Sequence, residues 1–290
     1  MNAAHRQLDF RIRFDWGLSG AAAIAEGADV AVVVDVLSFT TTLSVALDAG
    51  IEILPYRWRD KTAATYAAAH DAVLAVGRND AAAGAVSLSP GTIRSARDIR
   101  QLVLPSPNGS SISYALQSAT STCVGASLRN FHAVAAWLAR HHPAAVVAVV
   151  AAGEKWPDGS LRPAVEDLWG AGAVIAELVD THGFGALSPE AEQARCAWDA
   201  VAGRISEALH DCASGRELVE IGFADDVAVA SEIRCSGCVP ILVDHRFTDA
   251  ARHLAARSYF ARCPPPAATK FRGIEDEPRV AVGRDHVPKG

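Results

Sequence analysis

From Asp29 onward, short runs of β-branched residues alternate with Ala-rich stretches of helical length, and no other feature constrains the fold of this chain as strongly. The Val-rich and Ile-rich runs predict strands at 30–35, 51–55, 72–76, 102–105, 122–126 and 146–151. The stretches between them predict helices at 40–49, 61–70, 110–118 and 131–141, and one from Pro163 to about Thr181. Val-rich strands that are each followed by a helix are typical of a mostly parallel sheet covered on both faces. We therefore expect an α/β fold with three layers, α/β/α, and a mostly parallel (mixed) sheet.

The pattern changes after Gly183. Helices are expected at 189–199, at 202–211 and near 217–222, and a strand ending at 239–242 follows them. We interpret residues 1–182 as the main α/β catalytic region and residues 183–248 as a smaller, mainly helical C-terminal lobe that returns one strand to the sheet. Residues 249–290 contain a Pro-Pro-Pro run and are polar without apolar periodicity, which predicts a loosely ordered C-terminal tail.

The charge balance narrows the choice of partner. Half of the 290 residues are hydrophobic, 21% are charged, and the formal net charge is −6. Because the chain lacks a dense basic run, we expect neither nucleic acid nor an anionic membrane as its partner. The N-terminus carries charges from His5 to Arg13, where a signal peptide needs an apolar stretch, so a cytoplasmic location is expected. A small molecule is the expected ligand, and α/β enzymes of this size are often homodimers.

Ligands of open α/β sheets bind where strands end and loops lead into the next helix. At the first such junction Asp35 follows a Val-rich strand, and Ser38, Thr40, Thr41 and Thr42 follow as a helix begins. Free N–H groups and hydroxyls at a helix N-terminus suit a phosphate, and the carboxylate suits a divalent cation or a phosphoryl-acceptor role. The alternative is that Ser38 or Thr40 only caps the helix and that Asp35 adds favourable charge near its start.

The next two junctions supply further polar groups. Within 105–111, Asn108 and Gly109 permit positive φ and Ser110 opens a helix, so this segment either binds an anion or forms a tight turn. Within 125–130, Ser127 and Asn130 fit turn or N-cap positions. Arg129 in the same loop either holds an anionic substrate by a bidentate contact or is simply solvated.

Carboxylates gather at the fourth junction. Glu154 follows the strand predicted at 146–151, and Glu166 and Asp167 stand in the first turn of the last long helix. Adjacent acids at this position either only favour the helix dipole or hold a metal together with Asp35. Carboxylates from several strand ends are what Mg²⁺-assisted phosphoryl transfer needs. We therefore predict Mg²⁺ as the cofactor, with Asp35, Glu166 and Asp167 as its ligands or as the catalytic base.

Other chemistries have little support. No Ser-His-Asp or Cys-His set can be assigned, and neither GxGxxG nor GxxxxGK[ST] occurs. Haloacid dehalogenase-type phosphatases need a second Asp two residues after the first, where this chain has Leu37. Cys235 and Cys238 form a CxxC pair, but no second pair completes a zinc site. We expect ordinary thiols there, with a thiol or zinc protein as the weaker alternative.

The motifs at these junctions also occur in a specific order. They read Val34-Asp35-Val36-Leu37-Ser38-Phe39-Thr40-Thr41-Thr42, Ser89-Pro90, Pro107-Asn108-Gly109-Ser110, Gly125-Ala126-Ser127-Leu128-Arg129-Asn130 and Glu166-Asp167-Leu168-Trp169-Gly170-Ala171-Gly172. Over roughly 29–242 this series resembles the 2-phosphosulfolactate phosphatase family. The resemblance implies an α/β fold special to that family. It also implies Mg²⁺-dependent hydrolysis of 2-phosphosulfolactate to 3-sulfolactate and phosphate, a step towards coenzyme M.

On this hypothesis each candidate residue has a role. Asp35, Glu166 and Asp167 supply the metal ligands or the base. The substrate-binding residues are then Ser38, Thr40, Thr41, Asn108, Gly109 and Ser110 around the phosphate, Arg78 or Arg129 at a distal anion, and Asn130.

The sequence also departs from the family pattern. Ser38 stands where the family usually has an arginine, and the usual Gly-Glu-Arg loop reads Gly77-Arg78-Asn79. Ser110 replaces the threonine of an Asn-Gly-Thr loop, and 154–162 resembles a longer insert. These changes leave an alternative open: a catalytically altered relative that binds a phosphorylated metabolite or hydrolyses a different ester.

Overall fold

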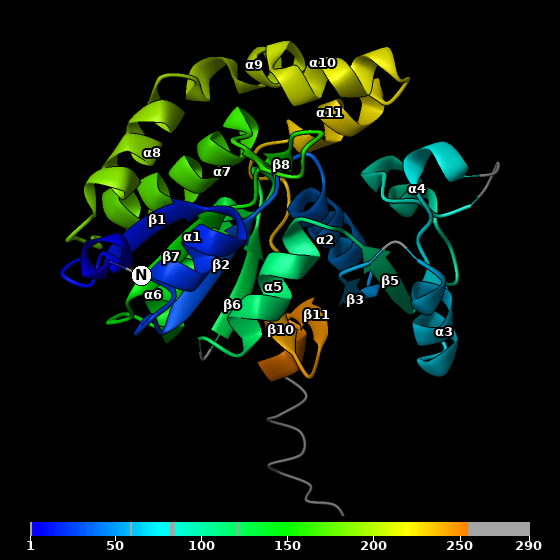
Figure 1. The fold of residues 1–290 in the computed structure, drawn as a ribbon, viewed down its shortest axis with the longest axis horizontal. Helices are drawn as coiled ribbons and strands as arrows, with labels where there is room; N and C mark the ends of the chain where they lie inside the picture. The colour runs from blue at the N-terminus through cyan, green and yellow to red at the C-terminus, as the bar shows by residue number, and fades with distance from the viewer. Residues whose placement is uncertain (1, 59, 82–84, 121, 255–290) are drawn as a thin grey trace, which may run out of the picture.

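The computed structural model describes residues 2–58, 60–81, 85–120 and 122–254. These residues form a nine-stranded sheet in the order β1-β7-β2-β6-β10-β11-β3-β5-β4 (Figure 1). Its strands are β1 (Ile12–Trp16), β2 (Val30–Val34), β3 (Glu52–Tyr56), β4 (Val73–Leu74), β5 (Gln101–Pro105), β6 (Thr122–Ala126), β7 (Val147–Ala151), β10 (Pro240–Val243) and β11 (Arg246–Asp249). A small separate hairpin pairs β8 (Glu154–Lys155) with β9 (Leu161–Arg162).

Two parallel sets of strands make up the large sheet. Strands β1, β7, β2 and β6 are parallel to one another, and so are β3, β5 and β4. The hairpin β10–β11 lies between the sets and pairs antiparallel with β6 on one side and with β3 on the other. The two sets therefore run in opposite directions across the sheet. The sheet is mostly parallel and mixed, as predicted.

The sheet curls strongly between the two sets. Five steps separate β2 from β5, which is about 24 Å in a flat sheet. Yet only three residues, 106–108, join β5 to a helix whose first N–H group contacts Asp35 at the end of β2. The four Cα–Cα steps from Pro105 to Gly109 span at most about 14 Å, so the sheet is bent between β2 and β5.

Helices cover both faces of the sheet. α1 (Gly17–Ile24), α2 (Phe39–Asp48), α4 (Pro90–Ser95) and α5 (Gly109–Gln117) pack on one face. α6 (Phe131–His141) and α7 (Val165–Ala176), which a π-helical turn (Glu177–Thr181) extends, pack on the other. In β2, Ala31 and Val33 belong to the first core, whereas Val30, Val32 and Val34 belong to the second. α3 (Lys61–Ala69) packs near β4 and β5. The predicted three-layer α/β/α arrangement is confirmed.

The C-terminal lobe is helical and arches over one end of the sheet (Figure 1). α8 (Pro189–Asp199) packs against α7, and α9 (Ile205–Asp211), α10 (Ala213–Glu220) and α11 (Ala224–Ala230) follow, with α11 against α4. The sequence predicts one returning strand, whereas the structure returns a hairpin, and this hairpin lies in the middle of the sheet. Asp249 ends β11 and residues 250–254 are helical. The rest of the predicted tail, 255–290, lies outside the described residues.

The N-terminal strand β1 and helix α1 are absent from the sequence-based prediction. The reason is Arg13, a charged residue in a short strand that is nevertheless only 3% exposed. Its guanidinium donates to the backbone carbonyl oxygens of Phe10, Ile24 and Glu26 at 3.1, 3.1 and 2.7 Å. These bonds satisfy acceptors around the end of α1, so a cation replaces the apolar residue that the strand pattern requires.

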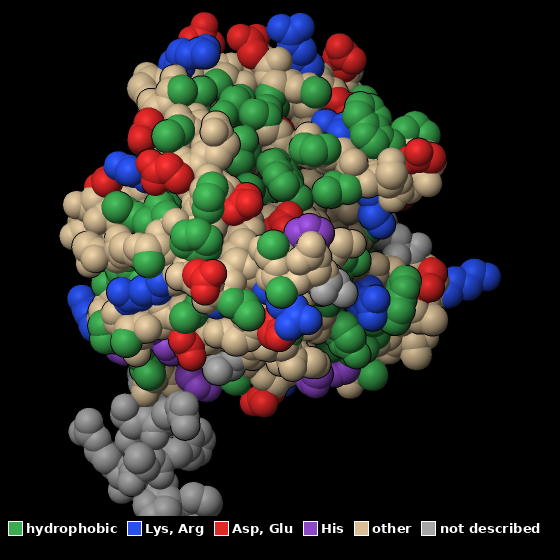
Figure 2. Space-filling model, turned by 60° about the vertical axis from the view of Figure 1, so that its left-hand side comes forward, with side chains coloured by type: hydrophobic (Ala, Val, Ile, Leu, Met, Phe, Trp, Pro, Cys, Tyr) green, Lys and Arg blue, Asp and Glu red, His purple; other side chains and the backbone are tan. Residues whose placement is uncertain are grey.

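The surface carries both signs of charge. On the face shown in Figure 2, Lys and Arg side chains are interspersed with Asp and Glu, as expected from a net charge of −6. None of the described helices is long and apolar enough to cross a membrane.

Candidate active site

Asp35 lies directly after β2 and joins the N-termini of two helices. Its Oδ1 accepts the N–H groups of Ser38 and Phe39 at 2.9 and 3.1 Å, where α2 begins. Its Oδ2 accepts the N–H group of Gly109 at 3.2 Å, where α5 begins. The residue is 7% exposed. One buried carboxylate therefore binds donors from helices that belong to the two different strand sets.

The local sequence fixes the backbone of Asp35. Thr40 Oγ1 donates to the Asp35 carbonyl oxygen at 2.8 Å and accepts the Asp35 N–H group at 2.9 Å. Ser38 makes no capping hydrogen bond to α2, because Asp35 itself takes the first N–H groups. The expected cap by Ser38 or Thr40 is thus not found, whereas the charge of Asp35 does lie at the start of α2, as that alternative also holds. Thr41 Oγ1 is buried in the first turn of α2 and has no partner among the described residues.

Gly109 allows α5 to approach Asp35. A Cβ atom at this position would lie 2.8 Å from Asp35 Oδ2 and would also overlap the ring of Phe39. Any side chain here would push the start of α5 away from the carboxylate. The next predicted residue, Ser110, points elsewhere: its Oγ donates to the backbone carbonyl of Leu104 at 3.1 Å.

Asp167 holds the start of α7 beside the segment that carries Asp35. Its Oδ1 accepts the N–H group of Val36 at 2.7 Å and its Oδ2 accepts that of Gly153 at 2.9 Å. The preceding Glu166 is also buried, at 2% exposure. Gly170, one turn further on, lets α7 lie close to β2, since a Cβ there would meet Val34 and Val36 within 2.7 Å.

Four acids thus share one buried region, and we call Asp35, Glu154, Glu166 and Asp167 the Asp35 cluster. Burial raises the pKa of Asp167 well above its usual range, and the Asp35 and Glu166 carboxylates raise it further. Burial also raises the pKa of Asp35, although its three N–H bonds and the Arg78 charge oppose this shift. The pKa of Glu154 is raised by burial and then by Asp35. Full ionisation of Asp35, Glu154 and Asp167 is therefore unfavourable unless a cation compensates their charges.

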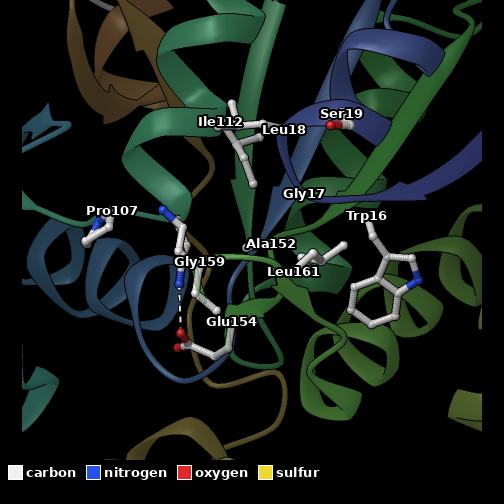
Figure 3. Close-up of a pocket in the computed structure, with 12 residues that line it drawn as sticks. Trp16, Gly17, Leu18, Ser19, Pro107, Ile112, Ala152, Glu154, Gly159 and Leu161 are labelled. Atoms are coloured by element: carbon white, nitrogen blue, oxygen red, sulfur yellow. Dashed lines mark hydrogen bonds between the residues drawn. The ribbon is translucent and has the colours of Figure 1, made fainter. Parts of the chain in front are cut away.

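A cavity of about 260 Å³ opens beside the cluster. Figure 3 shows the hydrogen bond of 2.9 Å that Asn108 Nδ2 donates to Glu154 Oε2 at its rim. Leu18 from α1, Ile112 from α5 and Leu161 from the β8–β9 hairpin supply apolar walls. The segment 154–162, a longer insert by sequence, is therefore part of the wall of the cavity.

Besides Arg162, whose charge acts on Glu154, Arg78 is a cation that adjoins the cluster. It lies in a short 3-10 turn (Arg78–Asp80), and its charge opposes the raised pKa of Asp35. Its Nε donates to Asp226 Oδ2 at 2.8 Å, while its Nη2 is buried and has no partner among the described residues. This donor is available for an anion.

Arg129 and Asn130 lie in a separate network. Arg129 donates from Nε to Ser44 Oγ at 2.9 Å and from Nη2 to Asp48 at 3.0 Å, and its Nη1 bonds to Glu232. Asn130 Oδ1 accepts the N–H group of Ser127 at 2.8 Å, and its Nδ2 donates to the Cys238 carbonyl at 3.2 Å. The structure brings neither side chain into contact with the Asp35 cluster. Their proposed substrate roles stay untested predictions.

A metal site made of protein side chains alone is absent from the described residues. No group of three His, Cys, Asp or Glu side chains there is arranged to hold a metal ion on its own. Cys238 is buried and burial raises the pKa of its thiol to about 12, whereas Cys235 is exposed. Such a thiol is a weak metal ligand, because the thiolate is the form that binds.

Comparison with known proteins adds the family. A family model described as 2-phosphosulpholactate phosphatase matches residues 21–245. A protein of Deinococcus radiodurans named "Probable 2-phosphosulfolactate phosphatase" is 31% identical over 226 residues, which are 74% of this chain and 88% of that protein. A protein of Thermus thermophilus with the same name is 32% identical over 221 residues, again 74% and 88% of the two chains.

The cluster lies after strand ends, where open α/β sheets bind their ligands, and with these matches it defines a phosphatase, a hydrolase of phosphate monoesters. The chain belongs to the 2-phosphosulpholactate phosphatase family. The resemblance predicted from the ordered motifs is confirmed. Asp226 is the residue that the sequence prediction misses, because 148 positions separate it from Arg78 and no local pattern marks it.

Proposed function

We propose that this chain hydrolyses 2-phosphosulfolactate to 3-sulfolactate and phosphate in a Mg²⁺-dependent reaction, the step towards coenzyme M that the family resemblance implies. The Asp35 cluster carries the proposal, since it places buried acids beside donors that lack partners. The names of the relatives support this substrate. A phosphate monoester is the anion that such donors and a hard cation bind together.

The phosphate would bind at the start of α2 and α5. The N–H groups of Ser38, Phe39 and Gly109 already bind Asp35, so the positive dipole ends of the two helices, and not those donors, would favour the anion. Two side-chain donors without partners among the described residues, Arg78 Nη2 and Thr41 Oγ1, add to them. Asn108 would keep Glu154 turned toward the rim of the cavity through its hydrogen bond.

The donor set fits Mg²⁺. Asp35, Glu166 and Asp167 present hard carboxylate oxygens, and their mutual repulsion would be relieved by a divalent cation. Mg²⁺ is commonly held by one or two carboxylates, waters and the substrate phosphate, so a complete protein cage is not required. When bound, the ion would neutralise the oxygens of the phosphate group. Asp167, whose pKa burial and neighbouring acids raise, would be the better placed of these acids to take a proton from the attacking water.

The test is phosphate release from 2-phosphosulfolactate, with Mg²⁺ and with a chelator. We expect Asp35→Asn to lower kcat/KM about 1,000-fold, since the substitution removes a central charge of the site. Asp15→Asn is the matched control, because Asp15 lies near the end of β1, two strands away from β2, and accepts an N–H bond from Trp16 at 2.7 Å. Wild-type turnover by a folded Asp35→Asn protein would contradict the proposal.

Ser38 supports a second candidate, hydrolysis of a different ester, because a serine stands where the family usually has an arginine. Phosphate release from a 2-phosphorylated acid that lacks the sulfonate separates the two. Faster turnover of that compound favours the second candidate. Faster turnover of 2-phosphosulfolactate favours the first.

A further inference from the structure

Arg78 is held in place by the C-terminal lobe. Its Nε donates to Asp226 Oδ2 at 2.8 Å, and its guanidinium lies 5.9 Å from the centre of the Phe223 ring. Asp226 and Phe223 both belong to the start of α11. The side chain of Arg78 is 15% exposed and that of Asp226 is 2% exposed. A turn of the main α/β region and a helix of the lobe therefore meet through a partly buried ion pair.

Asp226 has its second oxygen occupied as well. Ser89 Oγ donates to Asp226 Oδ1, so the carboxylate is fixed between α4 and the turn that carries Arg78. With both oxygens bound, the carboxylate cannot rotate freely. Its geometry decides where the remaining donors of Arg78 point, because the guanidinium is a planar and rigid fork.

The Arg78 donors that do not bind Asp226 distinguish this ion pair from a purely structural one. Arg129, the other buried arginine near the lobe, has Nε, Nη1 and Nη2 all bonded to protein acceptors. Arg78 keeps Nη2 buried without a partner among the described residues, and its charge acts on Asp35. A buried donor without a partner is costly, and an oxyanion of the ligand would remove that cost.

We propose that Asp226 is a positioning residue, which turns Arg78 toward a tetrahedral oxyanion bound at the Asp35 cluster. The C-terminal lobe thereby completes the phosphate-binding site of the main region. Assigning the oxyanion to a phosphate rests on the proposed function. Asp226 itself does not touch the ligand, because Arg78 and Ser89 occupy its oxygens.

Calorimetric binding of inorganic phosphate to the full chain with Mg²⁺ tests this inference. We expect Asp226→Asn to weaken binding about tenfold, because a charge-assisted hydrogen bond becomes a neutral one. Asp225→Asn is the matched control: the same substitution one position earlier on α11, at an exposed residue. Equal phosphate affinity in the two variants overturns the inference, and so does a wild-type protein that does not bind phosphate at millimolar concentration.

A double-mutant cycle separates positioning from a general loss of structure. If Asp226 acts through Arg78, then Asp226→Asn has little further effect on phosphate affinity in an Arg78→Ala background. Independent, additive losses overturn the inference. If thermal unfolding shows that Asp226→Asn does not fold, Ser89→Ala decides instead: we expect about threefold weaker phosphate binding, and unchanged binding overturns the inference.

Failure of the inference about Asp226 can be distinguished from failure of the proposed function. A protein that releases no phosphate from 2-phosphosulfolactate, yet shows the expected cycle with inorganic phosphate, disproves the substrate and supports the role of Asp226. A protein that hydrolyses the ester with equal kcat/KM in the Asp226→Asn and Asp225→Asn variants disproves the role of Asp226 alone.

Discussion

The Asp35 cluster and the network around Arg129 are both buried, charged and built at the ends of neighbouring strands. In the Arg129 network, a 4% exposed arginine meets the acids Asp48 and Glu232 and the hydroxyl of Ser44. In the Asp35 cluster, acids face one another and an arginine donor lacks a partner among the described residues. The Arg129 network compensates its charges within the protein, whereas the Asp35 cluster leaves charge for a cation and an anion to compensate.

This difference tells a structural role from a binding site, which the sequence alone cannot do. Both regions follow a strand with an unusual charged residue, and both were predicted to bind substrate. What distinguishes them is whether each charge already has a partner, because burying a charge without one is unfavourable unless a ligand supplies it. A complete set of partners indicates a structural role, and an incomplete one indicates a binding site.

The largest effect is expected at Glu166. Glu166→Gln should lower kcat/KM for phosphate release about 1,000-fold, because it removes a buried charge from the cluster. The same change should make the metal-free protein at pH 8 more stable by about 1 kcal/mol, because it relieves repulsion on Asp167. Enzyme assays and urea unfolding measure the two effects.

Glu177→Gln is the control for that prediction. Glu177 follows α7 directly and is also buried, at 8% exposure, but Arg234 binds it at 2.5 Å. Its replacement should lower stability and leave the kinetics intact. If both substitutions act alike, the contrast between an incomplete and a complete set of partners is wrong.

A smaller effect, on stability alone, is expected at Arg129. Arg129→Met should lower the free energy of unfolding by about 2 kcal/mol, because it breaks buried hydrogen bonds to acids that are about one-third exposed. The kcat/KM of the folded variant should stay within about threefold of wild type. Arg94→Met removes a 45% exposed partner of the same Glu232 and should cost less than about 1 kcal/mol. A large loss of kcat/KM in folded Arg129→Met would instead support the predicted substrate role.

The smallest effect concerns pH and Mg²⁺. Folding raises the pKa of Asp35 and Asp167 above the value near 3.9 that these side chains have in the unfolded chain. Between the unfolded pKa and the folded pKa, the folded protein therefore binds more protons than the unfolded chain does. The stability from their neutral forms is full below the unfolded pKa and is lost as the pH rises through the folded pKa. Mg²⁺ should therefore stabilise the protein more at pH 8 than at pH 5.5, by about 1 kcal/mol. Thermal unfolding with NaCl of equal ionic strength is the control, and equal stabilisation at both pH values would count against a carboxylate site.

The Arg129 network should respond to pH with the opposite sign. The hydrogen bond from Arg94 lowers the pKa of Glu232. Burial opposes this shift, and the charge of Arg129 adds to it. Its contribution to stability is present above the unfolded pKa and is lost as the pH falls through the lower folded pKa.

Local patterns in the sequence predict much of the fold. The predicted strands at 51–55, 102–105, 122–126 and 146–151 and the helix at 131–141 agree with the structure within about one residue, since period and length determine such elements locally. The position of β10–β11 between β6 and β3 was not predictable, because it depends on pairings between residues more than one hundred positions apart.

The candidate site also has a part that the sequence predicts and a part that it does not. Asp35 and Asp167 were identified because each stands beside a strand end and a helix start in the sequence. The partners of Arg129 and Arg78 lie 103 and 148 positions away, at Glu232 and Asp226. Nothing near these arginines in the sequence tells a satisfied guanidinium from an available one.

The central position of β10–β11 has a consequence for how the chain is made. Until residues 240–249 leave the ribosome, β6 and β3 each present an unpaired edge, and the two halves of the sheet have no strand between them. Unpaired edges invite pairing with other chains, and late long-range contacts slow folding. A nascent chain of this family therefore carries two exposed half-sheets through most of its synthesis, and a message cut short before codon 240 encodes a protein with two open edges.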